Sequence, residues 1–169
     1  MPRFRLDRHP APIGEMLLVT DADGALRGLD FPEFEAKLLR LLRAQYREDV
    51  TLTAGAAPRA IVRALDAYFA GDLAAIDAIP VATGGTPFQR AVWAELRTIP
   101  VGTTTTYGAL ANRLGHPTAF RAVGAANGAN PVPIVVPCHR VIGANGALTG
   151  YGGGEFRKRW LLDHEGAHP

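Results

Sequence analysis

The chain contains a single cysteine, Cys138, and this limits the ways in which its fold can be held together. One thiol can form neither an internal disulfide nor a zinc site made of several thiolates, so we expect no metal. A hydrophobic core must stabilise the fold instead, and 169 residues with 47% hydrophobic side chains are enough to bury one. No apolar run approaches the roughly 20 residues of a membrane helix, and the first residues lack the apolar stretch of a secretory signal. We therefore expect a cytoplasmic protein that does not contact a membrane.

The first half of the chain predicts a small sheet with helices. Apolar runs and turn residues predict, in order, a hairpin and two helices, over residues 14–31, 33–46 and 58–70. Residues 72–85 are expected to be extended. They end in the glycine pair Gly84-Gly85, which we predict as the boundary between a first domain of residues 1–85 and a second of residues 86–169.

The second half opens with a helix that begins at a capping box of Thr86 and Gln89 and stops at Ile99. Two further helices are expected, each capped by a threonine, over residues 106–114 and 118–127. A strand, a two-stranded wing and a last helix follow, over residues 134–136, 141–148 and 155–165. The last helix is expected to bury Phe156, Trp160 and Leu161 or Leu162. Two short helices joined by a tight turn and followed by a wing are typical of a winged helix-turn-helix domain that binds DNA.

The charge of the chain is unevenly distributed. Residues 86–169 carry eight basic and four acidic side chains, a net charge of +4, whereas residues 1–85 carry −2. A basic half suits a polyanionic partner, although many ordinary surfaces reach this charge. The helix expected over 118–127 is rich in alanine and glycine and carries one charge, Arg121. Such small side chains let the backbone approach a partner closely, but they equally suit close packing in a core.

Cys138 follows the apolar run that ends in Pro137 and precedes His139. A thiol at the end of a rigid strand can open onto a cleft, which suits a nucleophile. The attacking form is the thiolate, and a free cysteine with a pKa of about 8.5 needs a neighbouring base or cation to raise the ionised fraction. A lone cysteine can equally be a small buried hydrophobic residue. The eight residues around Cys138 do not decide between these interpretations.

A longer series of motifs resembles the O6-alkylguanine-DNA alkyltransferases, also called methylated-DNA–protein-cysteine methyltransferases, of the bacterial type. The matching motifs are Gly85-Thr-Pro-Phe-Gln89, Ile99-Pro-x-Gly102, Thr106-Tyr107-Gly108, Arg121-Ala-Val-Gly124, Asn127-Gly128-x-Asn130-Pro131, Pro137-Cys-His-Arg-Val141, Gly150-Tyr151-x-Gly-Gly154 and Leu161-Leu162-x-x-Glu165. Residues 1–85 match in outline only. The resemblance implies an α/β (α+β) fold, in which a small ribonuclease-H-like sheet with helices precedes a winged-helix catalytic domain.

The resemblance also implies direct-reversal DNA repair. Cys138 would attack the alkyl carbon on guanine O6 by in-line displacement, after the base has been flipped out of the duplex, and O4-alkylthymine is a second candidate substrate. The transfer is irreversible and stoichiometric, so each molecule would act once. The implied partner is double-stranded DNA containing O6-alkylguanine. The protein would be a monomer without a cofactor, located in the cytoplasm at the nucleoid.

Five catalytic residues follow from the resemblance. Cys138 is the nucleophile, His139 acts on it through a water molecule, and Glu165 lies behind His139. Tyr107 would donate a hydrogen bond to ring N3 of the leaving guanine, and Asn130 would brace the turn that carries the cysteine. Taken alone, Tyr107 equally suits a ring packed at a helix start, and an acid such as Glu165 is more often solvated at a helix end.

The remaining implied residues bind DNA and the alkylated base. Arg121 would fill the space that the flipped base leaves in the stack, in a minor-groove complex. The other DNA-binding residues would be Thr118, Ala119, Ala122, Ala126, Asn127 and Gly128. The substrate pocket would be lined by Pro133, Val141, Tyr151, Gly152 and Gly153.

Three other functions compete with alkyl transfer. A lesion-binding module without chemistry, similar to the alkyltransferase-like proteins, would have no use for Cys138. A winged-helix transcription regulator would not explain the sequence Pro137-Cys138-His139. A thiol hydrolase would act repeatedly on a small substrate. The presence of Cys138 together with His139 and Glu165 favours the transferase.

Overall fold

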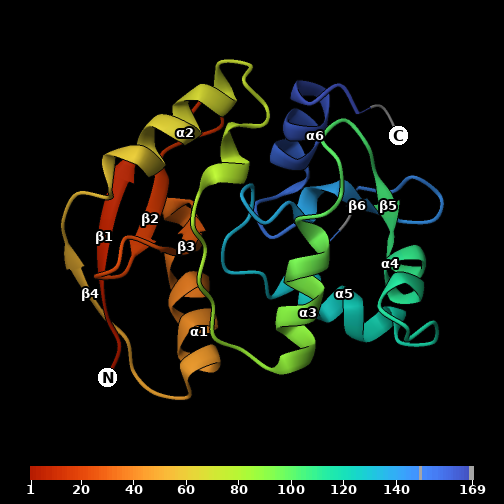
Figure 1. Ribbon diagram of the computed structural model, residues 1–169, viewed down its shortest axis with the longest axis horizontal. Coiled ribbons are helices and arrows are strands. Elements are labelled where there is room, and N and C mark those ends of the chain that lie inside the picture. Colours follow the sequence, from red (N-terminus) through yellow and green to blue (C-terminus); the bar gives the residue numbers. More distant parts are fainter. Residues whose placement is uncertain (149, 168–169) are drawn as a thin grey trace. The chain divides into compact units, whose positions relative to one another are not determined.

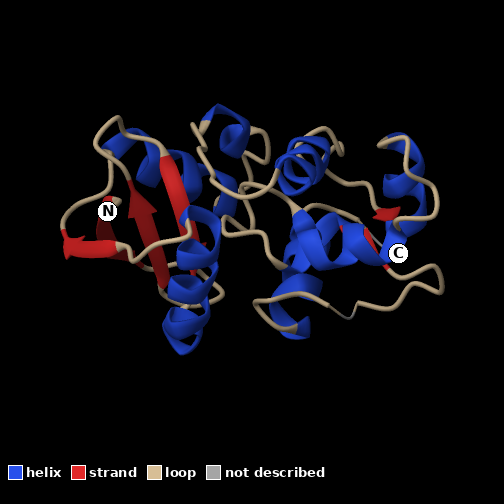
Figure 2. Cartoon of the chain, turned by 90° about the horizontal axis from the view of Figure 1, so that it is seen from below, coloured by secondary structure: helices blue, strands red, loops and turns tan. Residues whose placement is uncertain are grey.

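The computed structural model describes residues 1–148 and 150–167, and the chain divides into two compact units, Met1–Gly85 and Thr86–Pro169. Each unit combines helices with strands, so the predicted mixed α/β class is confirmed. Figure 1 shows the sheet of the first unit, and Figure 2 shows that helices and loops dominate the second. No helix in the described parts of the chain has the length and apolar character needed to cross a membrane.

The first unit is built on a four-stranded sheet with the order β3-β2-β1-β4. Its strands are β1 (Arg3–His9), β2 (Met16–Thr20), β3 (Leu26–Asp30) and β4 (Thr51–Ala54). β2 pairs antiparallel with both β1 and β3, and β4 joins β1 in parallel. β2 and β3 confirm the predicted hairpin. The sequence analysis did not predict β1 or β4, although apolar Phe4 and Leu6 alternate with charged residues in β1, as in a half-exposed strand.

Two helices of the first unit lie beside this sheet, and both were predicted: α1 (Glu35–Tyr46) and α2 (Arg59–Phe69). A 3-10 turn, η1 (Pro32–Phe34), leads into α1. Leu38 and Leu42 of α1 form a core cluster with side chains of β1 and β2, namely Phe4, Leu17 and Val19. One face of the sheet is thereby buried against α1.

Residues 72–85 are extended only in part, which corrects the prediction. A second 3-10 turn, η2 (Ala75–Ala78), follows α2, and Val81 then forms an isolated parallel bridge with Leu26. The backbone amides of Gly84 and Gly85 bond to Gln45 near the end of α1, at 3.2 and 3.4 Å. The end of the segment is therefore tied to the first unit.

The second unit contains the four predicted helices, α3 (Pro87–Leu96), α4 (Tyr107–Arg113), α5 (Phe120–Gly128) and α6 (Glu155–His164). The capping box of Thr86 and Gln89 is present, and the Thr106 side chain caps α4. Thr118 does not cap α5, because the amide of Ala119 bonds to His116 O at 2.9 Å and this turn makes Ala119 the N-cap residue. α5 packs against both α3 and α4.

The predicted strand over residues 134–136 is wrong. These residues form a turn in which Ile134 has a φ of 75° and Val136 N bonds back to Val132 O at 2.9 Å. Three prolines, Pro131, Pro133 and Pro137, surround the segment. Proline has no amide hydrogen for a strand ladder and restricts the residue before it, so the segment folds on itself.

The predicted wing also lacks its second strand. β6 (Val141–Ile142) pairs in parallel with β5 (Thr105–Thr106), and Ala147 and Leu148 are not in a strand. The turn at Asn145-Gly146 does form, with Gly146 at a φ of 81° and one closing bond of 2.9 Å from Gly143 N to Ala147 O. Leu148 instead packs in a cluster with Ile142 and Leu162.

α6 buries Leu161 and Leu162 as predicted, but the predicted burial of Phe156 is wrong. Lys158, Leu161 and Leu162 are buried, whereas Phe156 is 74% exposed. A helix rotates by about 100° per residue, so two residues place Phe156 on nearly the opposite side from Lys158. α6 packs against the turn that contains Cys138.

Candidate active site

Cys138 opens a 3-10 turn, η3 (Cys138–Arg140), inside a segment whose residues are all buried from 130 to 142. The cysteine is 5% exposed. Its amide bonds to Val136 O at 2.8 Å across Pro137, and its carbonyl accepts a hydrogen bond from Val141 N. Both backbone groups of Cys138 are thus fixed by hydrogen bonds to neighbouring residues.

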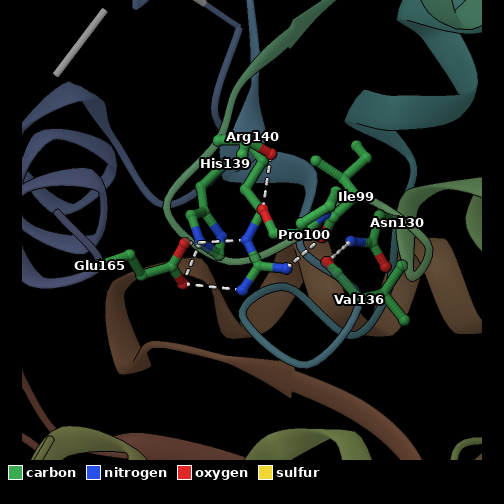
Figure 3. A network of polar contacts seen from close by, with 8 residues as sticks. Ile99, Pro100, Asn130, Val136, His139, Arg140 and Glu165 are labelled. Atoms are coloured by element: carbon green, nitrogen blue, oxygen red, sulfur yellow. Dashed lines mark hydrogen bonds and ion pairs between the residues drawn. The ribbon is translucent and has the colours of Figure 1, made fainter. Parts of the chain in front are cut away.

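Asn130 holds the segment that precedes the cysteine. Its Nδ2 donates to Val136 O at 2.8 Å (Figure 3). Its Oδ1 accepts from Val132 N at 3.0 Å. The Val136 carbonyl is the same group that accepts the amide of Cys138. Asn130 therefore binds the same carbonyl as the amide of Cys138, and it connects the end of α5 to this turn.

His139, Arg140 and Glu165 form a buried cluster next to the cysteine. His139 Nε2 lies 2.8 Å from Glu165 Oε2, and Arg140 donates to both carboxylate oxygens of Glu165, at 2.8 and 3.0 Å. Arg140 also donates to Ile99 O at 2.8 Å, which ties η3 to the end of α3 (Figure 3). The side chains of His139 and Glu165 are fully buried. Glu165 thus binds the two residues that follow Cys138.

Charge within this cluster sets the protonation states. Burial alone raises the pKa of Glu165, but the hydrogen bonds from His139 and Arg140 and the positive charge of Arg140 outweigh it and hold this pKa well below its usual range. Burial lowers the pKa of His139, and the Glu165 carboxylate opposes this only in part. At neutral pH the histidine is therefore neutral, and its Nε2 hydrogen points to the carboxylate, which can only accept. Nδ1 keeps its lone pair, and it has no hydrogen-bond partner among the described residues.

These two shifts predict how stability depends on pH. The unfolded chain takes up a proton at His139 below about pH 6.5, but the folded chain does not, so acidification favours unfolding. Glu165 contributes stability that is fully present above its unfolded pKa, about 4.3, and is lost below it. We expect the free energy of unfolding to fall in two stages as the pH is lowered. Urea unfolding of the wild type and of His139→Gln between pH 4 and 8 tests this. Equal losses in both proteins between pH 7 and 5 would contradict the assignment to His139.

Lys158 approaches the same turn from α6. It is 1% exposed, and its Nζ donates to Val141 O at 2.6 Å. Burial lowers the pKa of Lys158, whereas the negative charges of the Cys138 thiolate and of Glu155 raise it. A buried ammonium group therefore lies within electrostatic range of the cysteine and fixes the carbonyl that follows η3.

Tyr107, the first residue of α4, is held near the cysteine. Burial raises the pKa of its phenol, as does the charge of Cys138, and a side-chain hydrogen bond with Asn127 opposes these effects. The phenol is therefore protonated at neutral pH and can donate. A side chain at Gly150 would come within 3.1 Å of the Tyr107 hydroxyl, so the backbone at Gly150 covers this oxygen closely.

The structure separates the predicted DNA-binding residues into two groups. Exposed positions are Thr118, Arg121, Ala122 and Gly128, and Ala119 is half-buried. Ala126 and Asn127 are 3% and 4% exposed and face the interior of the unit, so their side chains are not available to a partner. The Ala126 carbonyl accepts the indole hydrogen of Trp93 at 2.8 Å. The spacing along α5 explains this, because Val123, Ala126 and Asn127 share its buried face.

Two of the predicted pocket residues, Pro133 and Val141, lie within the buried cysteine segment. Pro133, Val141, Tyr151 and Gly153 are buried, and Gly152 is exposed. The Gly153 carbonyl accepts a hydrogen bond from Arg157 at 3.1 Å. No cluster of three or more potential metal ligands occurs among residues 1–148 and 150–167.

The sequence analysis assigned no role to two residues of the site, Arg140 and Lys158. Arg140 directly precedes the apolar Val141, and Lys158 lies about one helical turn before the apolar Leu161. A charged residue at a position of a helix or strand that is expected to be buried is the signal that could have identified them. A buried charge needs a partner, so such a residue takes part in a polar contact within the protein.

The chain is similar to known proteins along nearly its whole length. Residues 87–167 match the family model of the 6-O-methylguanine DNA methyltransferase, DNA binding domain. The methylated-DNA–protein-cysteine methyltransferase of Shigella flexneri is 50% identical over 167 residues, which cover 98% of each chain. The protein of the same name from Methanosarcina acetivorans is 45% identical over 157 residues, covering 93% of this chain and 95% of the other. The crystal structure of Mycobacterium tuberculosis OGT in complex with DNA is similar with a TM-score of 0.78 and 42% identity, and 96% and 92% of the two chains are covered.

The match to the DNA-binding domain of a DNA methyltransferase, together with relatives named as methyltransferases, identifies the chain as a methyltransferase that acts on DNA. With half of its residues identical over nearly the full length of a relative, the chain belongs to the methylated-DNA–protein-cysteine methyltransferase family.

Proposed function

We propose that this chain repairs DNA by transferring the alkyl group of O6-alkylguanine in a duplex to Cys138, once and irreversibly. The observation that carries the proposal is the His139–Glu165 contact of 2.8 Å directly beside the cysteine. A carboxylate that accepts the Nε2 hydrogen leaves Nδ1 as a base, and it stabilises the imidazolium that forms when this base takes a proton.

The reaction needs one proton transfer and one displacement. The thiol proton of Cys138 passes through a water molecule to Nδ1 of His139. The thiolate then attacks the alkyl carbon in line with the bond to O6, so that a carbon–sulfur bond forms as the carbon–oxygen bond breaks. The electron pair of the broken bond stays on the guanine. The protonated phenol of Tyr107 donates to ring N3 and stabilises this charge. No cofactor takes part.

The base must leave the duplex to reach a cysteine that is 5% exposed. We assign DNA binding to the exposed face of α5, where Arg121 takes the place of the flipped base and Ala122 and Gly128 allow close approach to the minor groove. The carbonyls of Cys138 and Val141 recognise the guanine amino group. Each already accepts one hydrogen bond, but a carbonyl oxygen has two lone pairs and can accept another.

The same proposal covers the architecture and setting of the protein. Residues 1–85 would form a ribonuclease-H-like domain and residues 86–169 a winged-helix-like domain with the active-site cysteine. The protein would act as a monomer in the cytoplasm, at the nucleoid. O4-alkylthymine in DNA would be a second substrate.

The test is the mass of the protein after mixing with duplex DNA that carries one O6-methylguanine. We expect one added methyl group per molecule, located on the peptide that contains Cys138, and none in Cys138→Ala. The same experiment with O4-methylthymine tests the second substrate. Tight binding of the O6-methylguanine duplex with no change in protein mass would mean that the protein only recognises the lesion.

A further inference from the structure

The chain between Glu95 and Glu155 contains no aspartate or glutamate. This stretch includes α4, α5 and the cysteine turn. Two of its arginines are neutralised by carboxylates outside it, since Arg113 pairs with Glu95 at 2.8 Å and Arg140 with Glu165. The exposed side chain of Arg121 lies on α5. A polyanion can approach this part of the surface without repulsion from any carboxylate within the stretch.

An aromatic ring lies next to Arg121 on the same helix. Phe120 begins α5 and is 48% exposed, although a ring of this size is usually buried. The Arg121 guanidinium lies over the Phe120 ring, 5.9 Å from its centre, which is the range of a cation–π contact. The two side chains therefore form one exposed unit with a flat apolar part and a positive part.

The position of Phe120 on the helix points toward the cysteine site. Phe120 and Gly124 are four residues apart and lie on the same side of α5. A methyl group at Gly124 would contact the Tyr107 ring at 3.8 Å, so this side of the helix runs along Tyr107. Phe120 therefore lies at the start of the side of α5 that faces Tyr107, a residue we assign to catalysis.

We propose that Phe120 is a second side chain that penetrates duplex DNA, inserting beside Arg121 at the base step next to the flipped nucleotide. This inference rests on the proposed function, because it needs DNA as the substrate. Minor-groove proteins insert apolar wedges, Phe among them, between base pairs and unstack them. The stacked ring would also hold the Arg121 guanidinium in the direction of the gap.

The test compares Phe120→Ala with Phe156→Ala, which removes a ring that is 74% exposed on α6 of the same unit. We expect Phe120→Ala to weaken binding to duplex DNA, and to slow methyl transfer from it, by about tenfold, in the range for loss of one base–aromatic stack. Phe120→Trp should restore both. The free base O6-benzylguanine needs no extrusion, so its transfer to Cys138 should be unchanged in Phe120→Ala. A 2-aminopurine placed beside the lesion should show less unstacking with this variant than with the wild type.

Two results would overturn the inference. In the first, Phe120→Ala binds duplex DNA and accepts methyl groups from it as well as the wild type does. In the second, Phe120→Ala loses as much activity toward free O6-benzylguanine as toward duplex DNA, which would make the ring a structural residue. Failure of the proposed function is distinct, because the wild type itself would then transfer no methyl group from duplex DNA to Cys138.

Discussion

Replacing Glu165 with alanine is expected to lower the free energy of unfolding by about 3–5 kcal/mol, the cost of breaking a buried ion pair. The carboxylate accepts two hydrogen bonds from Arg140 and one from His139, and all three side chains are almost completely buried. Without it, the guanidinium of Arg140 keeps its charge in a site closed to water. The measurement is urea unfolding at pH 7.

The same variant should slow alkyl transfer by about 100-fold, in the range attributed to a general base. His139 would lose both the group that fixes its tautomer and the charge that stabilises its imidazolium. Because Glu165→Ala can unfold in part, Glu165→Gln provides a second variant that retains the shape and one acceptor oxygen. We expect it to be more stable than the alanine variant but similarly slow.

Glu155→Gln is the matched control for the unfolding measurement. Glu155 is an exposed carboxylate at the start of α6, and its removal should change the free energy of unfolding by about 0.5–1 kcal/mol at most. Equal effects of the Glu155 and Glu165 substitutions would show that the buried contacts of Glu165 carry no special role.

The parts of the fold that were predicted correctly from the sequence are set by interactions between residues close together along the chain. The capping box at Thr86 and the cap at Thr106 are local hydrogen bonds, and the hairpin of β2 and β3 follows from one turn. The wrong strand at 134–136 shows the limit of apolar runs as a signal. The run is buried, but Ile134 turns the chain at a φ of 75° and the nearby prolines cannot join a ladder.

The site shows a different limit. The motif series placed Cys138, His139 and Glu165 in one site by resemblance, but it did not reveal what Arg140 contacts. Arg140 binds Ile99 O, a backbone group 41 residues away, and Glu165, 25 residues away. Such partners are set by how α3, η3 and α6 pack together, and a spacing along the chain does not contain this information. The burial of Ala126 and Asn127, in contrast, was within reach, because it follows from the helical period.

For Lys158 we expect a much smaller effect on stability than for Glu165. Replacing it with methionine, which has a similar length, should change the free energy of unfolding by less than about 1 kcal/mol. The variant loses one hydrogen bond to Val141 O but no longer buries an ammonium group, and these two effects have opposite signs. Removing Glu165 leaves the buried charge of Arg140 without its carboxylate partner, whereas removing Lys158 removes a buried charge.

We nevertheless expect Cys138 to react more slowly in Lys158→Met. The ammonium group is a cation within electrostatic range of the thiolate, so its loss reduces the ionised fraction. We expect alkylation of Cys138 by iodoacetamide, and methyl transfer from DNA, to be about tenfold slower at pH 7, with the pH profile of alkylation moved to higher pH. Arg159→Met, which removes an exposed charge from the same helix, is the control and should leave the iodoacetamide profile unchanged.

The two readouts separate the two possible roles of Lys158. If the lysine acts only by holding the Val141 carbonyl, methyl transfer falls but the iodoacetamide profile stays in place, because that reagent needs no guanine contact. If it acts through charge, both reactions slow together and recover at higher pH. A variant that is unaffected in both reactions would leave the 2.6 Å contact as a structural bond alone. The buried charges on either side of Cys138 would then differ in function, with Glu165 acting through His139 and Lys158 serving only the fold.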